Sequence, residues 1–158
     1  MEISISLGSN IEPLLNIKKA QKLISNKFNI LKSSSLYSSN AEGFEGNCFI
    51  NQVITCDTKL SFEESIKTLK DIEKVLGRKK NNEKFSNRLI DLDLLTYGNE
   101  TINKIDKEVP HKDIEEYAFV LVPLCEISPD NIHPNLNISF KQLLKSKENF
   151  FDKVSKLD

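Results

Sequence analysis

Residues 88–95 read RLIDLDLL, a run in which acidic and apolar side chains alternate. Successive side chains of a β-strand point to opposite faces of the sheet, so a strand over residues 88–97 directs Ile90, Leu92 and Leu94 into the core. Asp91 and Asp93 then share the other face, where two close carboxylates repel each other unless a cation joins them. The pair suits Mg²⁺, which prefers hard oxygen ligands, although a solvent-exposed acidic strand face has the same pattern.

Three upstream segments also have the character of strands. Residues 2–7, 30–37 and 49–56 are short and bounded by polar or turn-forming residues. In the first of them, polar and apolar side chains alternate. This strand is expected to end at residues 8–10, where Gly-Ser-Asn interrupts the pattern.

Two helices are expected between these strands. Pro13 suits the first turn of a helix, because the missing N–H is not needed there. Ser61 and Glu64 have the spacing of a capping box at the start of the second helix, and Gly77 is a natural stop.

The resulting order is strand, helix, strand, strand, helix, strand. It predicts the α+β class with a ferredoxin-like βαββαβ core, an antiparallel sheet with helices packed on one face. Further helices are expected in the C-terminal part, over residues 119–125 and 140–144. A fold of this kind hosts many functions, so function has to come from particular residues.

Composition sets broad limits on the class of protein. The chain has 158 residues, a net charge of -1 and three cysteines without a Cys-x-x-Cys pair, which favours one cytoplasmic domain over residues 1–158. The near-neutral charge disfavours a nucleic-acid partner, and no apolar run is long enough to span a membrane. We expect a monomer that acts on small molecules.

A basic cluster lies immediately before the acidic strand. It consists of Arg78, Lys79, Lys80, Lys84 and Arg88. Arginine can grip a phosphate through two parallel hydrogen bonds and lysine acts as a point charge, so cations next to paired carboxylates suit a phosphate ligand held with Mg²⁺. A solvated surface loop has the same composition, and this alternative stays open.

Three more residues are candidates for ligand binding. Phe49 and Asn51 share one face of the third strand, where an aromatic ring could stack on a flat heterocycle and an amide could bond its edge. His111 follows Pro110 near the start of an expected helix. A core position for Phe49 and a structural role for His111 are the alternatives.

Taken in order, these pieces resemble the 6-hydroxymethyl-7,8-dihydropterin pyrophosphokinase family over nearly the whole chain. The motifs that carry the resemblance are Leu7-Gly8-Ser9-Asn10, Tyr37 before a long loop, Phe49-x-Asn51-x-Val53, Ile72-Glu73, Gly77-Arg78, Arg88-Leu89-Ile90-Asp91-Leu92-Asp93, Tyr97-Gly98-Asn99, Val109-Pro110-His111 and Phe119-x-Leu121-x-Pro123-Leu124-x-Glu126-Ile127.

The resemblance implies a reaction and a role for each matching residue. The reaction is transfer of pyrophosphate from ATP to the pterin alcohol with release of AMP, a step of folate biosynthesis. Phe49 and Phe119 would sandwich the pterin and Asn51 would bond its edge. Asp91 and Asp93 would bind two Mg²⁺ ions. The residues implied to contact or line the ATP site are Glu73, Arg78, Lys80, Arg88 and His111, and the implied catalytic set is Arg78, Arg88, Asp91 and Asp93.

The sequence departs from the family pattern mainly in two polar loops, 38–47 and 78–87, which are expected to close over the substrates. Ser86-Asn87 stands where Gly-Pro is usual, Phe85 replaces a larger aromatic residue, and Lys80 replaces an arginine. The first loop also lacks its usual prolines. These differences bear on nucleotide affinity and loop closure.

Three other functions remain as hypotheses from the residues alone. An RNA-binding module would use the open face of a four-stranded sheet, a regulatory module would bind pterin or nucleotide without turnover, and a different Mg²⁺-dependent transferase would release ADP. The missing aromatic signature on a central strand disfavours RNA binding.

Overall fold

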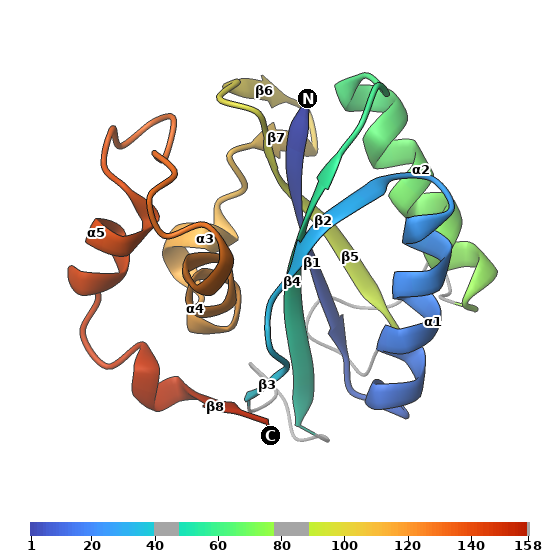
Figure 1. Cartoon of the computed structure of the whole chain (residues 1–158), viewed down its shortest axis with the longest axis horizontal. Coiled ribbons are helices and arrows are strands. Elements are labelled where there is room, and N and C mark those ends of the chain that lie inside the picture. Colours follow the sequence, from blue (N-terminus) through green and yellow to red (C-terminus); the bar gives the residue numbers. More distant parts are fainter. Residues whose placement is uncertain (40–47, 78–88, 158) are drawn as a thin grey trace.

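One antiparallel sheet lies between two layers of helices in the computed structural model (Figure 1). The structure describes residues 1–39, 48–77 and 89–157. The sheet runs in the order β5-β1-β4-β3-β8, and β2 also pairs with β4. This arrangement confirms the predicted ferredoxin-like core. The six strands are β1 Glu2–Ser9, β2 Asn29–Ser33, β3 Tyr37–Ser39, β4 Phe49–Asp57, β5 Asp91–Tyr97 and β8 Val154–Lys156.

Helices α1 (Pro13–Ser25) and α2 (Phe62–Val75) cover the first face of the sheet. Both start as predicted, since Pro13 opens α1 and the Ser61–Glu64 capping box opens α2. The strand predicted over residues 88–97 is β5, which starts only at Asp91, but its predicted core side is confirmed. Leu92 and Leu94 of β5 and Ile90 just before it pack into the cluster between these helices and the sheet. Burial of a branched aliphatic side chain of this size stabilises a fold by about 1.5–3 kcal/mol.

The second face of the sheet is covered by α4 (Ala118–Ile127), and the helices α3 (Asp113–Glu116) and α5 (Phe140–Lys145) pack against α4. Val53 of β4 and Leu95 of β5 join a separate core cluster with them. An RNA-binding module of this architecture needs that face open, so its covering by helices removes the main structural support for RNA binding.

The structure corrects two sequence predictions about strands. The first strand extends two residues beyond its predicted bound at residue 7, because β1 includes Gly8, ends at Ser9, and pairs with β4 at both residues. The strand expected over residues 30–37 is divided into β2 and β3, and both halves pair with β4. At the division the Ser34 side chain accepts a hydrogen bond from the Val53 backbone N–H at 3.0 Å, which replaces part of the strand ladder.

A short hairpin and the chain's last strand were missed by the sequence analysis. The hairpin joins β6 (Ile102–Lys104) to β7 (Lys107–Val109), and the short helix η1 (Phe151–Lys153) leads into β8. These strands have three residues each, too few for a period of two to stand out. Asp106 at the hairpin turn has φ +61°, a left-handed conformation that Asp tolerates better than most residues.

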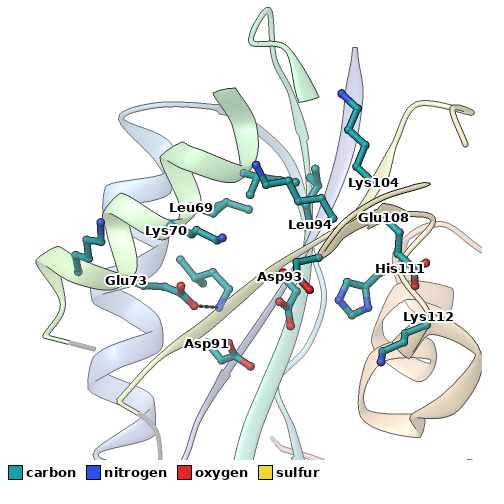
Figure 2. Close-up of a pocket in the computed structure, with 15 residues that line it drawn as sticks. Leu69, Lys70, Glu73, Asp91, Asp93, Leu94, Lys104, Glu108, His111 and Lys112 are labelled. Atoms are coloured by element: carbon teal, nitrogen blue, oxygen red, sulfur yellow. Dashed lines mark hydrogen bonds between the residues drawn. The ribbon is translucent and has the colours of Figure 1, made fainter. Parts of the chain in front are cut away.

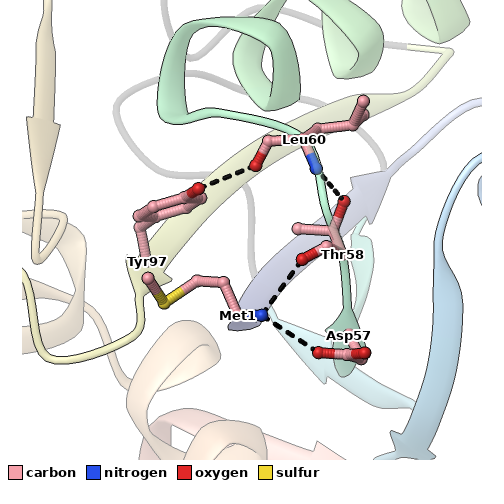
Figure 3. A network of polar contacts seen from close by, with 5 residues as sticks. All are labelled: Met1, Asp57, Thr58, Leu60 and Tyr97. Atoms are coloured by element: carbon pink, nitrogen blue, oxygen red, sulfur yellow. Dashed lines mark hydrogen bonds and ion pairs between the residues drawn. The ribbon is translucent and has the colours of Figure 1, made fainter.

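The start of β1 is held by a small polar network (Figure 3). The amino group of Met1 donates to Asp57 Oδ1 at 3.1 Å and to the Thr58 carbonyl at 3.0 Å. Thr58 Oγ1 accepts from the Leu60 N–H, and the Tyr97 hydroxyl donates to the Leu60 carbonyl. These bonds tie the start of β1 to the ends of β4 and β5, at the end of the sheet distant from the acidic pair.

Within the described ranges, every helix is too short or too polar to cross a bilayer.

The burial of His133 is expected to make the stability of the fold depend on pH. Its side chain is 1% exposed, and its Nδ1 accepts from the backbone N–H groups of Asn135 and Leu136, both at 3.2 Å. Burial lowers the pKa of His133 and outweighs the attraction of Glu115. Since the unfolded chain binds more protons near this pKa, we expect the melting temperature to fall as pH drops below about 6.5.

The variant His133→Asn tests this expectation, because its Oδ1 can still accept the two backbone bonds but does not titrate. Its melting temperature, measured from about pH 7.5 to 5, should change less than that of the unmodified chain. Equal slopes for the two proteins in this interval would show that His133 does not cause the pH dependence.

Candidate active site

A cleft of about 830 Å³ lies at the edge of the sheet where β5 faces α2 (Figure 2). Helix α2 forms one wall, and the β6–β7 hairpin with the segment after β7 forms the other. Four residues predicted from the sequence line this cleft, namely Glu73, Asp91, Asp93 and His111. The fold therefore brings three motifs of the resemblance together. Asp91 and Asp93 come from β5, His111 follows about twenty residues later in the chain, and Glu73 comes from α2.

Asp91 and Asp93 project from the same face of β5, as predicted from their spacing. Their pairing partners in β1 are Gly8 and Ser6, which follow the same alternation. In Figure 2 the side chain of Asp93 points toward the ring of His111 across the cleft. One ligand atom from each of Asp93, His111 and Asp113 lies within 4.8 Å of the others, so these residues could hold a cation together.

Asp113 was missed by the sequence analysis. Its position in the first turn of a helix is usual for an acidic residue that interacts with the helix dipole, so the sequence offered no separate signal. With Asp91 and Asp93 it supplies a third carboxylate close to the cleft. Oxygen ligands suit Mg²⁺, whereas the imidazole of His111 is a better ligand for zinc or copper.

The position and tautomer of His111 are fixed by backbone contacts. The backbone N–H of His111 donates to the Leu95 carbonyl of β5 at 2.8 Å, and this bond holds the segment after β7 beside the acidic strand. Its Nδ1 accepts from the Asp113 N–H at 3.1 Å, and Asp113 Oδ2 lies 3.7 Å from the same nitrogen. A neutral ring with Nδ1 as acceptor carries its hydrogen on Nε2, which can donate to a ligand oxygen.

Glu73 connects α2 to the acidic strand. Its carboxylate is nearly buried and accepts the Leu92 N–H at 2.8 Å, a bond drawn in Figure 2. Leu92 lies between the two aspartates, so Glu73 fixes the part of the edge strand that carries them. A buried carboxylate that bonds a backbone N–H supports the local geometry of this site.

Among the described residues, five lysines and five acidic residues line the cleft, so the charges of these ten side chains balance. Two of the lysines, Lys104 and Lys107, lie in the hairpin that the sequence analysis missed, and Lys104 forms an ion pair with Glu63 of α2. Cations on several walls of a cleft suit a ligand with several phosphates. The lysines are Lys70, Lys74, Lys104, Lys107 and Lys112, and the acidic residues are Glu73, Asp91, Asp93, Asp106 and Glu108.

Gly8 lies between the predicted heterocycle site and the acidic pair. It pairs with Asn51 on one side and with Asp91 on the other, so the three residues form one row across β4, β1 and β5. Directly paired residues point to the same face, which puts Asn51 and Asp91 two strand spacings apart, roughly 10 Å. A Cβ built on Gly8 would lie 3.3 Å from Asn51 Oδ1 and 3.9 Å from the Phe49 ring.

The side-chain amide of Asn51 is held in one orientation. It is 4% exposed, and its Nδ2 donates to Ser39 Oγ at 2.8 Å and to the Tyr37 carbonyl at 3.5 Å. Phe49 belongs to β4, like Asn51, and its half-buried ring lies next to Gly8 of β1. These contacts place the aromatic ring and the amide together at the same end of the sheet as Asp91.

Phe119 lies in the first turn of α4, the helix that packs on β4 and β3. Its ring is half-buried and stacks on Tyr117, with 4.9 Å between the ring centroids and an angle of 21°. The predicted residues Arg78, Lys80 and Arg88, together with Phe85, Ser86, Asn87 and residues 40–47, lie outside the described part.

Solved structures share this architecture. A crystal structure of Plasmodium falciparum HPPK-DHPS wild type with pteroate matches with a TM-score of 0.79 at 13% identity, over 98% of this chain and 47% of that one. A structure of HPPK-DHPS in complex with substrates gives 0.71 at 14% identity, over 96% and 44%. At these identities the likeness establishes the fold, and the present chain spans less than half of either protein.

Sequence similarity is more specific. The chain is 38% identical to the 2-amino-4-hydroxy-6-hydroxymethyldihydropteridine pyrophosphokinase of Aquifex aeolicus, over 84% of this chain and 83% of that one. It is 36% identical to the pyrophosphokinase of the same name from Haemophilus influenzae, over 85% and 86%. The folic acid synthesis protein fol1 of Pneumocystis carinii is 37% identical over 87% of this chain, which spans 19% of that protein.

The fold and the site together define the class of protein, a ferredoxin-like domain with a charged cleft at the edge strand that carries the acidic pair. Residues 4–129 match the family described as 7,8-dihydro-6-hydroxymethylpterin-pyrophosphokinase (HPPK). The chain belongs to this family, as the ordered motifs in its sequence predicted.

The close approach at Gly8 gives a prediction about ligand binding. In Gly8→Ala the new methyl group should displace the Asn51 amide by a few tenths of an ångström, so the affinity for 6-hydroxymethylpterin should fall, by roughly tenfold. Calorimetric titration would measure this. Ser6→Ala, one pair along the same strand, is the control and should bind normally. Unchanged affinity in Gly8→Ala would mean that the space above Gly8 is not used by the pterin.

Proposed function

We propose that this chain transfers pyrophosphate from ATP to 6-hydroxymethyl-7,8-dihydropterin and releases the pterin diphosphate and AMP, in folate biosynthesis. The observation that carries the proposal is the row Asn51–Gly8–Asp91. A pterin bonded at Asn51 would extend its hydroxymethyl group across Gly8 toward phosphates held at Asp91. In this arrangement the two substrates meet above the central strand of the sheet.

In the proposed pterin site, Phe49 and Phe119 stack on the two faces of the ring and Asn51 bonds its edge. The two Nδ2 hydrogens of Asn51 already donate to Ser39 Oγ and to the Tyr37 carbonyl, so Oδ1 is the amide atom left to accept from a donor on the pterin edge. Ser39 and Tyr37 already hold the amide, so little freedom is lost when the ring binds.

The proposed nucleotide site is the charged cleft. Asp91 and Asp93 are the proposed ligands of Mg²⁺, with two ions expected, and their carboxylate oxygens fit such a cation. When bound, the metal would neutralise charge on the ATP phosphates. The Nε2–H of His111 is suited to donate to a phosphate oxygen. Glu73 is assigned to the same nucleotide site, where its bond to Leu92 would keep the aspartates in position.

Arg78, Lys80 and Arg88 are proposed to contact the phosphates, and Arg78 and Arg88 to act in catalysis with the two aspartates. This assignment rests on the family resemblance alone. The attacking oxygen belongs to the pterin hydroxymethyl group and the leaving group is AMP. No residue is assigned as a general base, because a proton on either aspartate would oppose metal binding. Most of the rate would then come from alignment and charge neutralisation.

We further propose that residues 1–158 act as a single domain and as a monomer in the cytoplasm. One continuous sheet joins the N-terminal and C-terminal strands of the described part, which supports a single unit. Cys48, Cys56 and Cys125 form no disulfide, as expected in a reducing compartment.

The decisive experiment is incubation with ATP, Mg²⁺ and 6-hydroxymethyl-7,8-dihydropterin, followed by separation of the products. We expect AMP and a pterin diphosphate in equal amounts, and neither product when a substrate or Mg²⁺ is left out. ADP in place of AMP would indicate simple phosphoryl transfer. Binding of both substrates without any product would favour a regulatory module.

Replacement of the acidic pair tests the metal assignment. Asp91→Ala or Asp93→Ala should lower kcat by roughly a thousandfold or more while the fold is retained, because each removes a proposed metal ligand. Circular dichroism would check the fold and steady-state kinetics the rate. Glu100→Gln, an exposed carboxylate outside the cleft, is the control and should stay close to normal. Near-normal turnover of both aspartate variants would contradict the assignment.

Replacement of the aromatic ring on α4 tests the stacking assignment. Phe119→Ala should weaken pterin binding by roughly ten- to a hundredfold and leave ATP binding nearly unchanged, since it removes one face of the sandwich. Titration with each ligand separately would measure this. Phe151→Ala removes an exposed ring elsewhere and should change neither affinity. Equal losses for both ligands in Phe119→Ala would refute a specific stacking role.

A further inference from the structure

A carboxylate near the end of α4 holds the helix against the segment that leads into β3. Glu126 Oε2 accepts from the Ser35 N–H at 2.9 Å and from the Ser35 hydroxyl at 3.1 Å, and Oε1 accepts a short hydrogen bond from the Tyr37 hydroxyl. Tyr37 and Glu126 both belong to the motifs noted in the sequence, yet neither has a part in the proposed chemistry. One side chain thus joins two elements through three hydrogen bonds.

One end of this contact leads to Phe119. Phe119 and Glu126 are seven residues apart in α4, which is nearly two full turns, so they lie on the same side of the helix and roughly 10 Å apart along its axis. A shift of the helix at Glu126 therefore moves the ring of Phe119. Lys32 adds a contact at this end, since its Nζ donates to the Ile127 carbonyl at 3.4 Å.

The other end leads to Asn51. Tyr37 pairs directly with Asn51 across β3 and β4, and the Asn51 amide donates to the Tyr37 carbonyl and to Ser39 Oγ. The strand segment that Glu126 holds is therefore the one that orients the amide. Phe119 and Asn51 come from different layers of the fold, and the contacts of Glu126 connect the layers that carry them.

The electrostatics of the contact favour a persistent bond. Burial would raise the pKa of Glu126, but the hydrogen bonds from Tyr37 and Ser35 outweigh it and leave this pKa below its ordinary value. Burial and the neighbouring carboxylate raise the pKa of the Tyr37 hydroxyl. At neutral pH the carboxylate is charged and the phenol keeps its proton, and such charge-assisted bonds are stronger than neutral ones.

We infer that Glu126 is a positioning residue for the pterin. Through its hydrogen bonds to Tyr37 and Ser35 it sets the distance between the ring of Phe119 and the amide of Asn51, and thereby the width of the slot that the heterocycle enters. The inference rests on the proposed function and assigns to Glu126 and Tyr37 a part in substrate affinity, with no contact to the reacting atoms.

The test uses three variants that remove different parts of the contact. Glu126→Ala removes all three bonds, and Tyr37→Phe removes only the phenolic oxygen. In Glu126→Gln the amide can still accept from Ser35 and donate to Tyr37, so it is the conservative rescue. We expect KM for the pterin to rise roughly ten- to a hundredfold in Glu126→Ala, less in Tyr37→Phe and least in Glu126→Gln. KM for ATP should stay within about twofold.

A variant that only loses stability separates positioning from general loosening of the fold. Ser61→Ala breaks the capping box of α2, far from this contact, and is chosen because it should lower the melting temperature without changing pterin KM. If Glu126→Ala raises both KM values alike, or if its pterin KM is unchanged, the inference fails. An inactive unmodified chain would instead refute the proposed function, and direct pterin titration of the same variants would still test the slot.

Discussion

The antiparallel register of β1 between β4 and β5 is the constraint on which the site depends. It sets Asn51, Gly8 and Asp91 in one row, so residues from three distant parts of the chain share one face at fixed spacing. A shift by a single residue would turn Asn51 or Asp91 toward the opposite face, into the core beneath α1 and α2. The apolar side chains of β1 prevent that shift, because Ile3, Ile5 and Leu7 are all buried in that core. Packing on one face thus determines the chemistry on the other.

The charged cleft is built in a different way, from elements that approach the open edge of β5. Helix α2 supplies Glu73, which bonds the Leu92 backbone, and the segment after β7 supplies His111, which bonds the Leu95 backbone. Both contacts use backbone groups of the edge strand that β1 does not occupy. The same bonds therefore protect an exposed sheet edge and place a carboxylate and an imidazole beside the acidic pair.

The core and the acidic pair were predictable from sequence because each rests on a local pattern. Alternation in β5 separated Leu92 from Asp91 and Asp93, and capping chemistry marked the start of α2. Other features depend on contacts between distant segments. Gly8 was interpreted as a strand end, since a glycine in sequence does not reveal that Asn51 and Phe49 lie within van der Waals reach of the space above it. The sequence analysis missed Asp113, the hairpin lysines and the contact between Glu126 and Tyr37 for the same reason. Only their proximity in the folded chain distinguishes these residues from ordinary surface residues. The predicted roles of Arg78, Lys80 and Arg88 remain predictions.

The pairing of β8 with β3 has a consequence for the order in which the molecule can fold. Val154, Ser155 and Lys156 pair with Ser39, Ser38 and Tyr37, and the Leu157 N–H bonds the Leu36 carbonyl at 2.8 Å. During synthesis on the ribosome, β3, which bonds the Asn51 amide, is made early. Its outer neighbour β8 is made more than a hundred residues later. Contacts of such long sequence separation form slowly, because the chain must close a large loop first. A nascent chain that already contains β1, β4 and β5 but not yet β8 would still present β3 as an open sheet edge, with which other unfinished chains could pair.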